Sequence, residues 1–141
     1  MNQPKPIECE NLIRQAIAAQ ERAYAPYSHY KVGAAVQTEG GAIFTGCNIE
    51  NAVYPLCLCA ERVAIFKAVS EGAQRISAIA VVTANGGTPC GACRQVLREF
   101  SDLDTPVFIA WPDGTYREYT LDHLLPESFS QTDLPTDSEH R

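Results

Sequence analysis

The feature that most constrains the fold is a nearly continuous apolar run, Ile76 to Thr83, followed by a helical pattern and a second apolar run. Such a run is expected for a strand that is covered on both faces. After the turn residues 85–89, Cys90 to Phe100 has helical periodicity, and Pro106 to Trp111 has the pattern of another buried strand. A helix between two buried strands is a crossover connection, so Ile76–Thr83 and Pro106–Ala110 are predicted to be parallel neighbours.

The rest of the chain adds further helices and strands to this unit. Helical spacing of apolar residues predicts two helices, a third short helix is expected near the C-terminus, strand patterns predict three more strands, and Gly or Pro separates the elements. The order predicts an α/β fold, a three-layer α/β/α sandwich whose mixed sheet has about five strands. We expect a single domain over residues 1–141, with a polar, mobile tail over 130–141. The additional elements are the helices Glu10–Tyr24, Cys59–Ser70 and Thr120–Leu125, the hairpin Val32–Thr38 with Ala42–Cys47, the loop Asn48–Leu58, and the strand Thr115–Tyr119.

Composition narrows the possible partners and compartment. The net charge of -6 disfavours binding to a long polyanion, whose affinity comes mainly from Lys and Arg on phosphates. No apolar run reaches the length of a membrane span, and Met1 to Glu10 lacks a signal-peptide pattern, so we expect a cytoplasmic protein. Six cysteines in a reducing compartment indicate metal binding or catalysis more than a disulfide framework, which stays the alternative.

Two cysteine motifs, Cys59-Ala60-Glu61 and Pro89-Cys90-Gly91-Ala92-Cys93, each stand where a loop gives way to a predicted helix. The positive end of a helix lowers the pKa of a thiol and favours the thiolate. If the two helix ends converge, Cys59, Cys90 and Cys93 hold one Zn²⁺ per chain. Three protein ligands leave the fourth position of the metal open, which is typical of catalytic zinc sites.

The residues after Cys59 fit chemistry at that open position. Glu61 is the candidate proton carrier, because a positioned carboxylate accelerates proton transfer by about 10²–10⁴-fold. Three thiolates around a dication leave a formal charge of -1, which makes a water ligand less acidic than at a histidine-ligated zinc. We expect Arg62 to donate to a ligand sulfur and withdraw part of that charge. The alternative for Arg62 is a surface ion pair.

Other cysteines and histidines allow a different interpretation of the cluster. Cys57 stands two residues before Cys59 and would close a structural four-cysteine site, although a Cys-x-Cys pair is unusual in such sites. Cys9 and Cys47 are expected to be small buried apolar residues. The three histidines, His29, His123 and His140, are isolated in the sequence and are not assigned as ligands.

The two motifs together resemble the zinc-dependent cytidine deaminases, specifically the small homotetrameric three-cysteine type. Three further segments are similar to the family, so the resemblance covers nearly the whole chain: Ala25–Ala35, Thr45–Pro55 and Leu124–Phe129. It implies a cytidine deaminase-like fold and the zinc-dependent hydrolysis of cytidine and 2′-deoxycytidine to the uridines and ammonia, in pyrimidine salvage. It also implies a homotetramer with shared active sites and neither nucleic acid nor membrane as a partner.

The resemblance also implies which residues contact the substrate. Asn48 and Glu50 would bind the ribose hydroxyls, and the Ala60 backbone would hold the edge of the base. Tyr54 and Phe129 would complete neighbouring active sites across subunit boundaries. The implied set is Tyr30, Asn48, Glu50, Asn51, Tyr54, Ala60 and Phe129.

Two positions depart from the family pattern. Tyr30 stands where the family commonly has Phe, and Lys31 where it has Pro or another residue. Stacking on a pyrimidine survives a change from Phe to Tyr because the ring is retained. The added hydroxyl of Tyr30 needs a hydrogen-bond partner if it is buried.

Three other functions share parts of the pattern. A deaminase acting on a cytosine-containing nucleoside antibiotic would have the same metal motif, but Asn48-Ile49-Glu50 favours an ordinary ribonucleoside. A polynucleotide deaminase would need a basic channel that the acidic chain does not evidently supply. A non-enzymatic zinc module predicts four thiol ligands and no release of ammonia.

Overall fold

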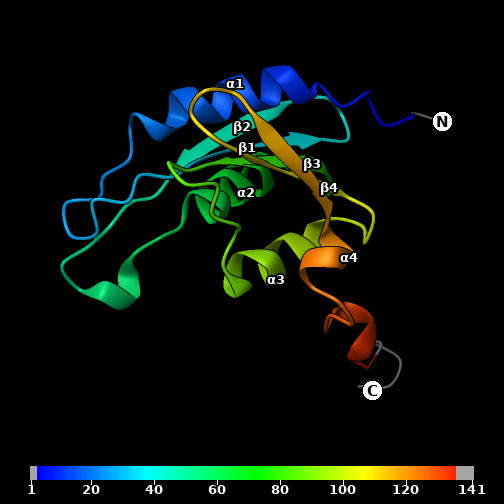
Figure 1. Ribbon diagram of the computed structural model, residues 1–141. Helices are drawn as coiled ribbons and strands as arrows, with labels where there is room; N and C mark the ends of the chain where they lie inside the picture. The colour runs from blue at the N-terminus through cyan, green and yellow to red at the C-terminus, as the bar shows by residue number, and fades with distance from the viewer. Residues whose placement is uncertain (1–2, 136–141) are drawn as a thin grey trace.

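The structure, a computed structural model, describes residues 3–135, which form one five-stranded sheet with helices packed on it (Figure 1). Within this part of the chain, no helix is long and apolar enough to cross a membrane. The elements in chain order are α1 (Cys9–Gln20), β1 (Gly33–Thr38), β2 (Ile43–Cys47), the 3₁₀ turn η1 (Tyr54–Leu56), α2 (Ala60–Ser70), β3 (Ile76–Val82), α3 (Gly91–Phe100), β4 (Pro106–Ala110), β5 (Tyr116–Thr120), α4 (Leu121–Leu124) and the 3₁₀ turn η2 (Gln131–Asp133).

The sheet is mixed and has the order β2-β1-β3-β4-β5. β1 and β2 pair antiparallel as the predicted hairpin, and β1 also pairs antiparallel with β3. β3 and β4 are parallel, with Ile79 opposite Val107, and β5 returns antiparallel along β4. The crossover through α3 is therefore confirmed, because a helix between β3 and β4 lets both strands run in the same direction.

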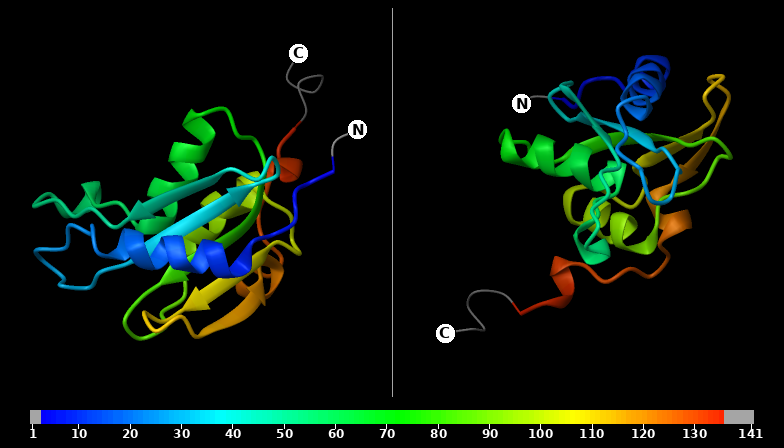
Figure 2. Two further views of the ribbon diagram at one scale, coloured as in Figure 1. Left: turned by 90° about the horizontal axis from the view of Figure 1, so that it is seen from above. Right: turned by 90° about the vertical axis from the view of Figure 1, so that its left-hand side faces the viewer.

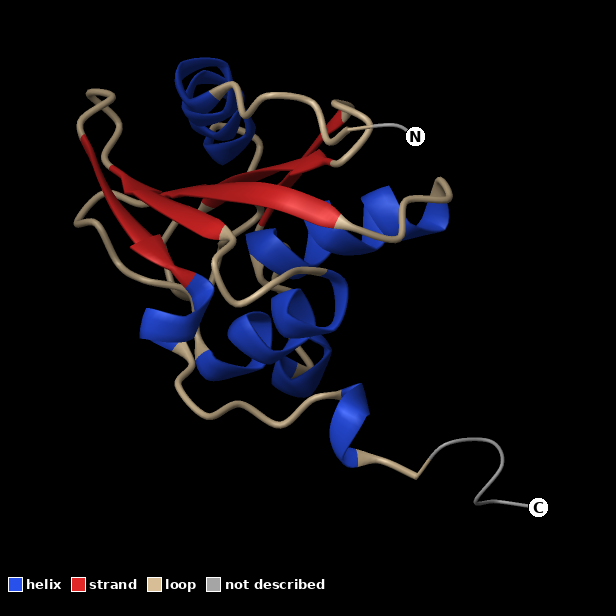
Figure 3. Cartoon of the chain, turned by 90° about the vertical axis from the view of Figure 1, so that its right-hand side faces the viewer, coloured by secondary structure: helices blue, strands red, loops and turns tan. Residues whose placement is uncertain are grey.

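Helices cover both faces of the sheet, which confirms the three-layer α/β/α architecture. α1 lies on one face, whereas α2 and α3 lie on the other, with α4 beside α3 (Figures 2 and 3). Along β3, Ile79 and Val81 pack on the α2 and α3 side, and Ala78, Ala80 and Val82 pack on α1. Full burial of a side chain such as Ile79 contributes about 1.5–3 kcal/mol, so both apolar faces of this strand stabilise the fold.

A glycine in β2 brings α2 close to the sheet. A Cβ at Gly46 would lie 2.5 Å from the Ala60 carbonyl oxygen and 2.6 Å from the Ala64 nitrogen. No larger residue fits between the strand and the first turn of α2. This close contact fixes the end of the helix where Cys59 and Glu61 are located.

The first helix is shorter than its sequence pattern predicts, since α1 ends at Gln20 and not at Tyr24. The backbone of Tyr24 instead pairs with the loop after β2: its N–H donates to Asn48 O at 2.9 Å, and its carbonyl accepts from Glu50 N at 2.9 Å. A tertiary contact therefore overrides the helical preference of the last four residues. The same contact joins the segment before β1 to the segment after β2.

The predicted loop over residues 48–58 is more ordered than its composition suggests. Ile49 and Leu58 exchange two backbone hydrogen bonds, of 3.0 and 2.9 Å. These bonds close the loop of residues 50–57, here called the excursion, and η1 lies within it. Periodicity could not reveal this pairing, because it joins single residues and not two strands.

The first part of the polar tail also has structure. Ser130 and Asp133 form a capping box around η2, and Ser130 is buried. The later tail residues, 136–141, lie outside the described residues, so the mobility of the tail stays a prediction.

Candidate metal centre and active site

Three cysteine sulfurs converge at the ends of two helices. Cys59 is the N-cap of α2, Cys90 is the N-cap of α3, and Cys93 lies in the first turn of α3. All three Sγ atoms lie within 4.8 Å of one another, with 3.9 Å between Cys59 and Cys90 and 3.4 Å between Cys90 and Cys93. Tetrahedral Zn²⁺ with bonds of about 2.3 Å places its sulfur ligands roughly 3.8 Å apart. The cluster therefore fits one Zn²⁺ per chain.

The other cysteines do not join the cluster. Cys57 Sγ instead accepts a hydrogen bond from Asn51 N at 3.2 Å, and all six cysteines are free thiols. Cys9 and Cys47 are partly buried and not buried as expected, and among the described residues neither belongs to the cluster. Among the described residues, the sulfurs form a site of three ligands and not a closed site of four.

Arg62 lies beside the cluster. Its Nη2 donates to Cys59 Sγ at 3.4 Å, and its Nε is buried with no hydrogen-bond partner in the described part of the chain. The neighbouring Cys93 thiol and the Arg62 guanidinium hold the pKa of Cys59 down to about 5, whereas the contact with Cys59 and burial raise the pKa of Cys93. Without metal, the cluster therefore holds a thiolate at Cys59 and a proton at Cys93, which Zn²⁺ must displace when it binds. Over residues 3–135, the recorded ion pair joins Arg75 to Asp102 and does not involve Arg62.

Glu61 occupies the first turn of α2, directly beside the metal cluster. It is only 5% exposed, and it lines the same cavity as Cys59 and Cys90. Burial raises the pKa of Glu61 to about 7, the negative charge of Cys59 adds to the rise, and Arg62 acts against it. A carboxyl group with this pKa both accepts and releases a proton near neutral pH.

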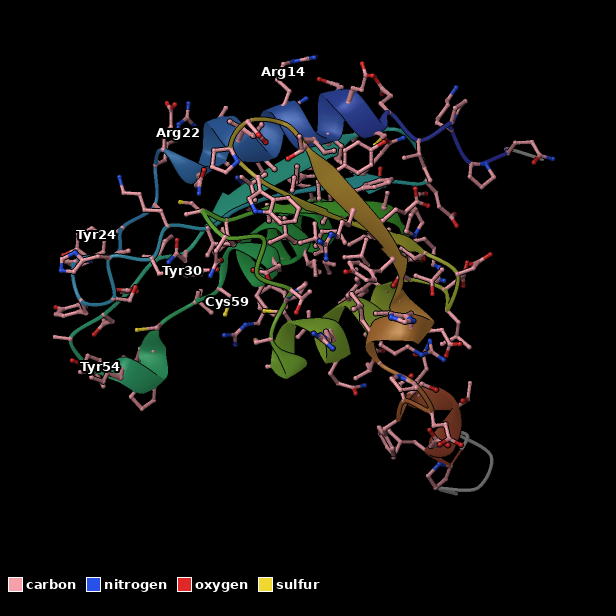
Figure 4. The ribbon with its side chains drawn as sticks, in the orientation of Figure 1. Arg14, Arg22, Tyr24, Tyr30, Tyr54 and Cys59 are labelled. Carbon is pink, nitrogen blue, oxygen red and sulfur yellow. The ribbon has the colours of Figure 1, made fainter. Side chains whose placement is uncertain are left out.

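The cavity at the cluster has a volume of about 530 Å³, within the range of small-molecule sites. Figure 4 shows Tyr30 and Cys59 on neighbouring segments, with Tyr54 on the excursion that holds η1. Asn51, Ala60, Cys93 and Phe129 do not line the cavity. The predicted site residues that do line it are Tyr30, Asn48, Glu50, Tyr54, Cys59, Glu61, Arg62 and Cys90.

Asn48 is tied to the backbone that leads into β1. Its Oδ1 accepts from Val32 N at 2.9 Å, and its Nδ2 donates to Tyr30 O at 2.7 Å. An amide has two N–H groups and two lone pairs on oxygen. Asn48 therefore keeps one donor and one acceptor position for a ligand, and its contact with ribose stays a prediction.

Glu50 anchors the segment before Tyr30. Its Oε1 accepts from Tyr27 N at 2.9 Å and Ser28 N at 3.0 Å, and its Oε2 accepts from the Ser28 hydroxyl. The hydrogen bonds from the side chain and backbone of Ser28 hold the pKa of Glu50 below its usual range. A carboxylate offers about four acceptor positions, so one remains on Oε2. The residue is charged and partly free to accept a hydroxyl.

Two other predicted contact residues are largely exposed. Tyr54 is 68% exposed at the rim of the cavity. Its ring packs edge-on against the ring of Tyr27, with 5.8 Å between the two ring centroids. Phe129 is 57% exposed and lines a different cavity, beside α2 and α3. Within one chain the structure therefore does not bring Phe129 to the metal cluster.

Sequence reasoning missed Arg94, which fastens the segment before Cys90. Its Nε donates to Pro89 O at 2.7 Å, its Nη2 to Thr88 Oγ1 at 2.9 Å, and its Nη1 to Leu124 O. A basic residue on an exposed helical turn carries no local signal for this role. Only the position directly after Cys93 marked it as a neighbour of the site.

Comparison with known proteins agrees with this geometry. Residues 7–109 match the family profile described as "Cytidine and deoxycytidylate deaminase zinc-binding region". The chain belongs to this family. It is similar to cytidine deaminase from Sporosarcina psychrophila, with 48% identity over 91% of this chain and 96% of that protein. A second relative is the cytidine deaminase of Halalkalibacterium halodurans, with 49% identity over 87% and 95% of the two chains.

A solved structure has the same fold as this family member. The crystal structure of cytidine deaminase from Burkholderia pseudomallei superposes with a TM-score of 0.82 at 46% identity, and the match covers 87% of this chain and all of that chain (100%). The resemblance inferred from the cysteine motifs is therefore confirmed, together with the fold class.

Proposed function

We propose that the protein is a cytidine deaminase that hydrolyses cytidine and 2′-deoxycytidine to uridine and 2′-deoxyuridine, with release of ammonia. The observation that carries this proposal is one cavity lined both by Cys59 and Cys90 of the three-cysteine cluster and by the buried carboxyl group of Glu61, whose pKa is about 7. Membership of the deaminase family and the relatives' named activity support it. A non-enzymatic zinc module explains neither the cavity nor the burial of Glu61.

Cys59, Cys90 and Cys93 hold the metal in this proposal. When bound there, Zn²⁺ would lower the pKa of a water molecule and so supply the nucleophile. Glu61 accepts a proton from the water and donates it to ring N3 as the oxygen adds to C4 of cytosine. Glu61 then takes the remaining proton of the added water and delivers it to the exocyclic amino nitrogen, which leaves as ammonia. One water is consumed, and the C4–N bond is replaced by a C4–O bond.

The surroundings of the cluster suit this work. The N-termini of α2 and α3 point partial positive charge at the sulfurs, and Arg62 donates to Cys59. Both effects oppose the excess negative charge of three thiolates. We infer that Arg62 thereby keeps the metal electron-poor enough to acidify a water.

We assign nucleoside binding to the part of the cavity wall that Tyr30, Asn48 and Glu50 form. The Tyr30 ring stacks on the base, while the free positions of Asn48 and Glu50 Oε2 receive the ribose hydroxyls. Asn51 supports this wall through its backbone hydrogen bond to Cys57. The Ala60 backbone, at the start of α2, borders the base edge.

We also propose a homotetramer with shared active sites. Apolar side chains are exposed on the excursion at the cavity rim, where Tyr54, Leu56 and Val53 are 68%, 63% and 57% exposed. Phe66 and Phe129 are exposed on another face. Surfaces of this kind are usually covered in an assembly, and Phe129 reaches a metal cluster only if that cluster belongs to a neighbouring subunit.

We infer that one catalytic domain acts in the cytoplasm in pyrimidine salvage, on free nucleosides and not on nucleic acid or a membrane. Six free thiols suit a reducing compartment, and the net charge of -6 opposes a polynucleotide substrate.

The test is ammonia release. Purified protein is incubated with cytidine, deoxycytidine or a cytosine-containing oligonucleotide, with and without a chelator. We expect chelator-sensitive release from the two nucleosides and none from the oligonucleotide. Release from the oligonucleotide alone would favour a polynucleotide deaminase, and no release with zinc-loaded protein would refute the proposal.

Two variants test the assigned roles. Glu61→Gln should keep zinc and lose about 10²–10⁴-fold in kcat, because the amide cannot carry the proton. Mixed tetramers of Glu61→Gln and Phe129→Ala should recover activity above the mean of the two parents, because some sites then combine an intact Glu61 with an intact Phe129. No recovery in verified mixed tetramers would contradict shared sites.

A further inference from the structure

The hydroxyl of Tyr30 has a partner far away in the sequence. Tyr30 lines the cavity, and its Oη donates to Asn85 Oδ1 at 2.7 Å. Its backbone is fixed independently, since Tyr30 N donates to Ser28 Oγ at 3.0 Å and Asn48 donates to Tyr30 O. Hydrogen bonds therefore fix Tyr30 at two places, at its backbone and, through Asn85, at its hydroxyl group.

Asn85 belongs to the loop that joins β3 to the metal ligand Cys90. Its Oδ1 also accepts from Thr83 Oγ1 at 3.3 Å, and Thr83 Oγ1 in turn accepts from Gly87 N at 2.7 Å. Thr83 is buried and lines the cavity. A continuous chain of hydrogen bonds thus runs from the Tyr30 hydroxyl into the backbone of the loop.

Steric contacts hold the same loop from two sides. A Cβ at Gly87 would lie 2.6 Å from Tyr30 Oη, and one at Gly86 would lie 2.2 Å from the ring of Trp111. The two glycines let the backbone lie between the tyrosine hydroxyl and the indole. The loop then continues to Cys90 through Thr88, which also lines the cavity.

We propose that Asn85 is a positioning residue: through the Tyr30 hydroxyl it fixes both the stacking ring and the loop that delivers Cys90. A phenylalanine at position 30 would lack the hydroxyl group. In this chain the hydroxyl therefore has a structural role, as a tether between the ring and the loop. The part of this proposal that concerns the base rests on the proposed function. The part that concerns Cys90 does not.

A double-mutant cycle tests the tether with Tyr30→Phe, Asn85→Ala and the double variant. Loss of one neutral hydrogen bond should raise KM for cytidine about 3- to 10-fold in each single variant, with kcat changed less than about 2-fold. The double variant should be no worse than the singles. Asn85→Asp, which keeps the acceptor oxygen, should restore a KM close to that of the parent protein.

The matched control is Tyr24→Phe. Tyr24 does not line the cavity and is 56% exposed. It should leave KM unchanged.

A second readout does not depend on activity. The rate at which a chromogenic chelator removes zinc should rise about 3- to 10-fold in Tyr30→Phe and Asn85→Ala, again without a further rise in the double variant. Multiplicative effects in the double variant, or no effect on either readout, would overturn the tether. If the parent protein releases no ammonia, the proposed function has failed, and the zinc-release cycle alone decides the tether.

Discussion

Replacing Glu61 by Gln should stabilise the metal-free protein at neutral and alkaline pH, and it should lower kcat of the zinc-loaded protein by about 10²–10⁴-fold. Glu61 is buried beside the thiolate of Cys59, so the folded protein favours its neutral form and its pKa rises to about 7. In the unfolded chain the carboxyl group returns to a value near 4.5. Gln has nearly the same shape and no charge to bury.

The sign and size follow from proton linkage. Below pH 4.5 both states are protonated, so the carboxyl group adds no penalty to folding. Between pH 4.5 and 7 the unfolded chain releases the proton first, so the stability of the folded protein falls as pH rises. Because each pH unit of this interval corresponds to about 1.4 kcal/mol, the loss is about 3 kcal/mol above pH 7. The Gln variant does not suffer this loss.

The assay is urea unfolding of chelator-treated, reduced protein at equal protomer concentration, followed by the fluorescence of the single tryptophan, Trp111. Measurements at pH 4 and from pH 6 to pH 8 bracket the interval and omit the region around the pI near 5.0, where solubility is lowest. The stability difference between Glu61→Gln and the parent protein should grow by about 3 kcal/mol across this range. Zinc should reduce the difference, because a nearby dication favours the charged carboxylate.

The matched control is Glu71→Gln, at an exposed position at the end of the same helix. It should show no comparable growth of the difference with pH. If the stabilities of Glu61→Gln and the parent protein had parallel pH dependences, burial would not be raising the pKa of Glu61, and its proposed role as a carrier near neutral pH would lose its physical basis.

Three further predictions concern the metal and the fold. Cys57→Ser should retain one zinc per chain and Cys93→Ser should lose it, as measured by elemental analysis, and zinc loss in Cys57→Ser would favour a closed four-cysteine site. Arg62→Gln should weaken zinc binding or lower kcat by about 10-fold or more. Chelator competition measures the first effect and ammonia release the second. If both values stayed unchanged, Arg62 would not be withdrawing charge from the cluster. Gly46→Val should lower stability by more than about 3 kcal/mol, because the added side chain meets the backbone of α2 at the Ala60 carbonyl; a thermal or urea unfolding midpoint equal to the parent's would show that the helix and strand can separate freely.

Several features of the fold were predictable because they depend on residues close together in the chain. The apolar run of β3, the crossover through α3 and the glycine turn of the hairpin all carry local signals. The N-cap positions of Cys59 and Cys90 were equally predictable, since each cysteine directly precedes a helical pattern. The end of α1 was not, because Tyr24 pairs with backbone 24 to 26 residues further on.

By itself, the sequence predicted the three cysteines that converge in the fold and the carboxyl group beside them, because helix starts and cysteine spacing are local properties. Only the tertiary structure decided what surrounds them. The burial that raises the pKa of Glu61 depends on segments brought together by the sheet. The same is true of the hydrogen bonds that use most donor and acceptor positions of the Asn48 and Glu50 side chains. The partner of the Tyr30 hydroxyl lies 55 residues away, and no pattern of neighbouring residues encodes a contact of that range.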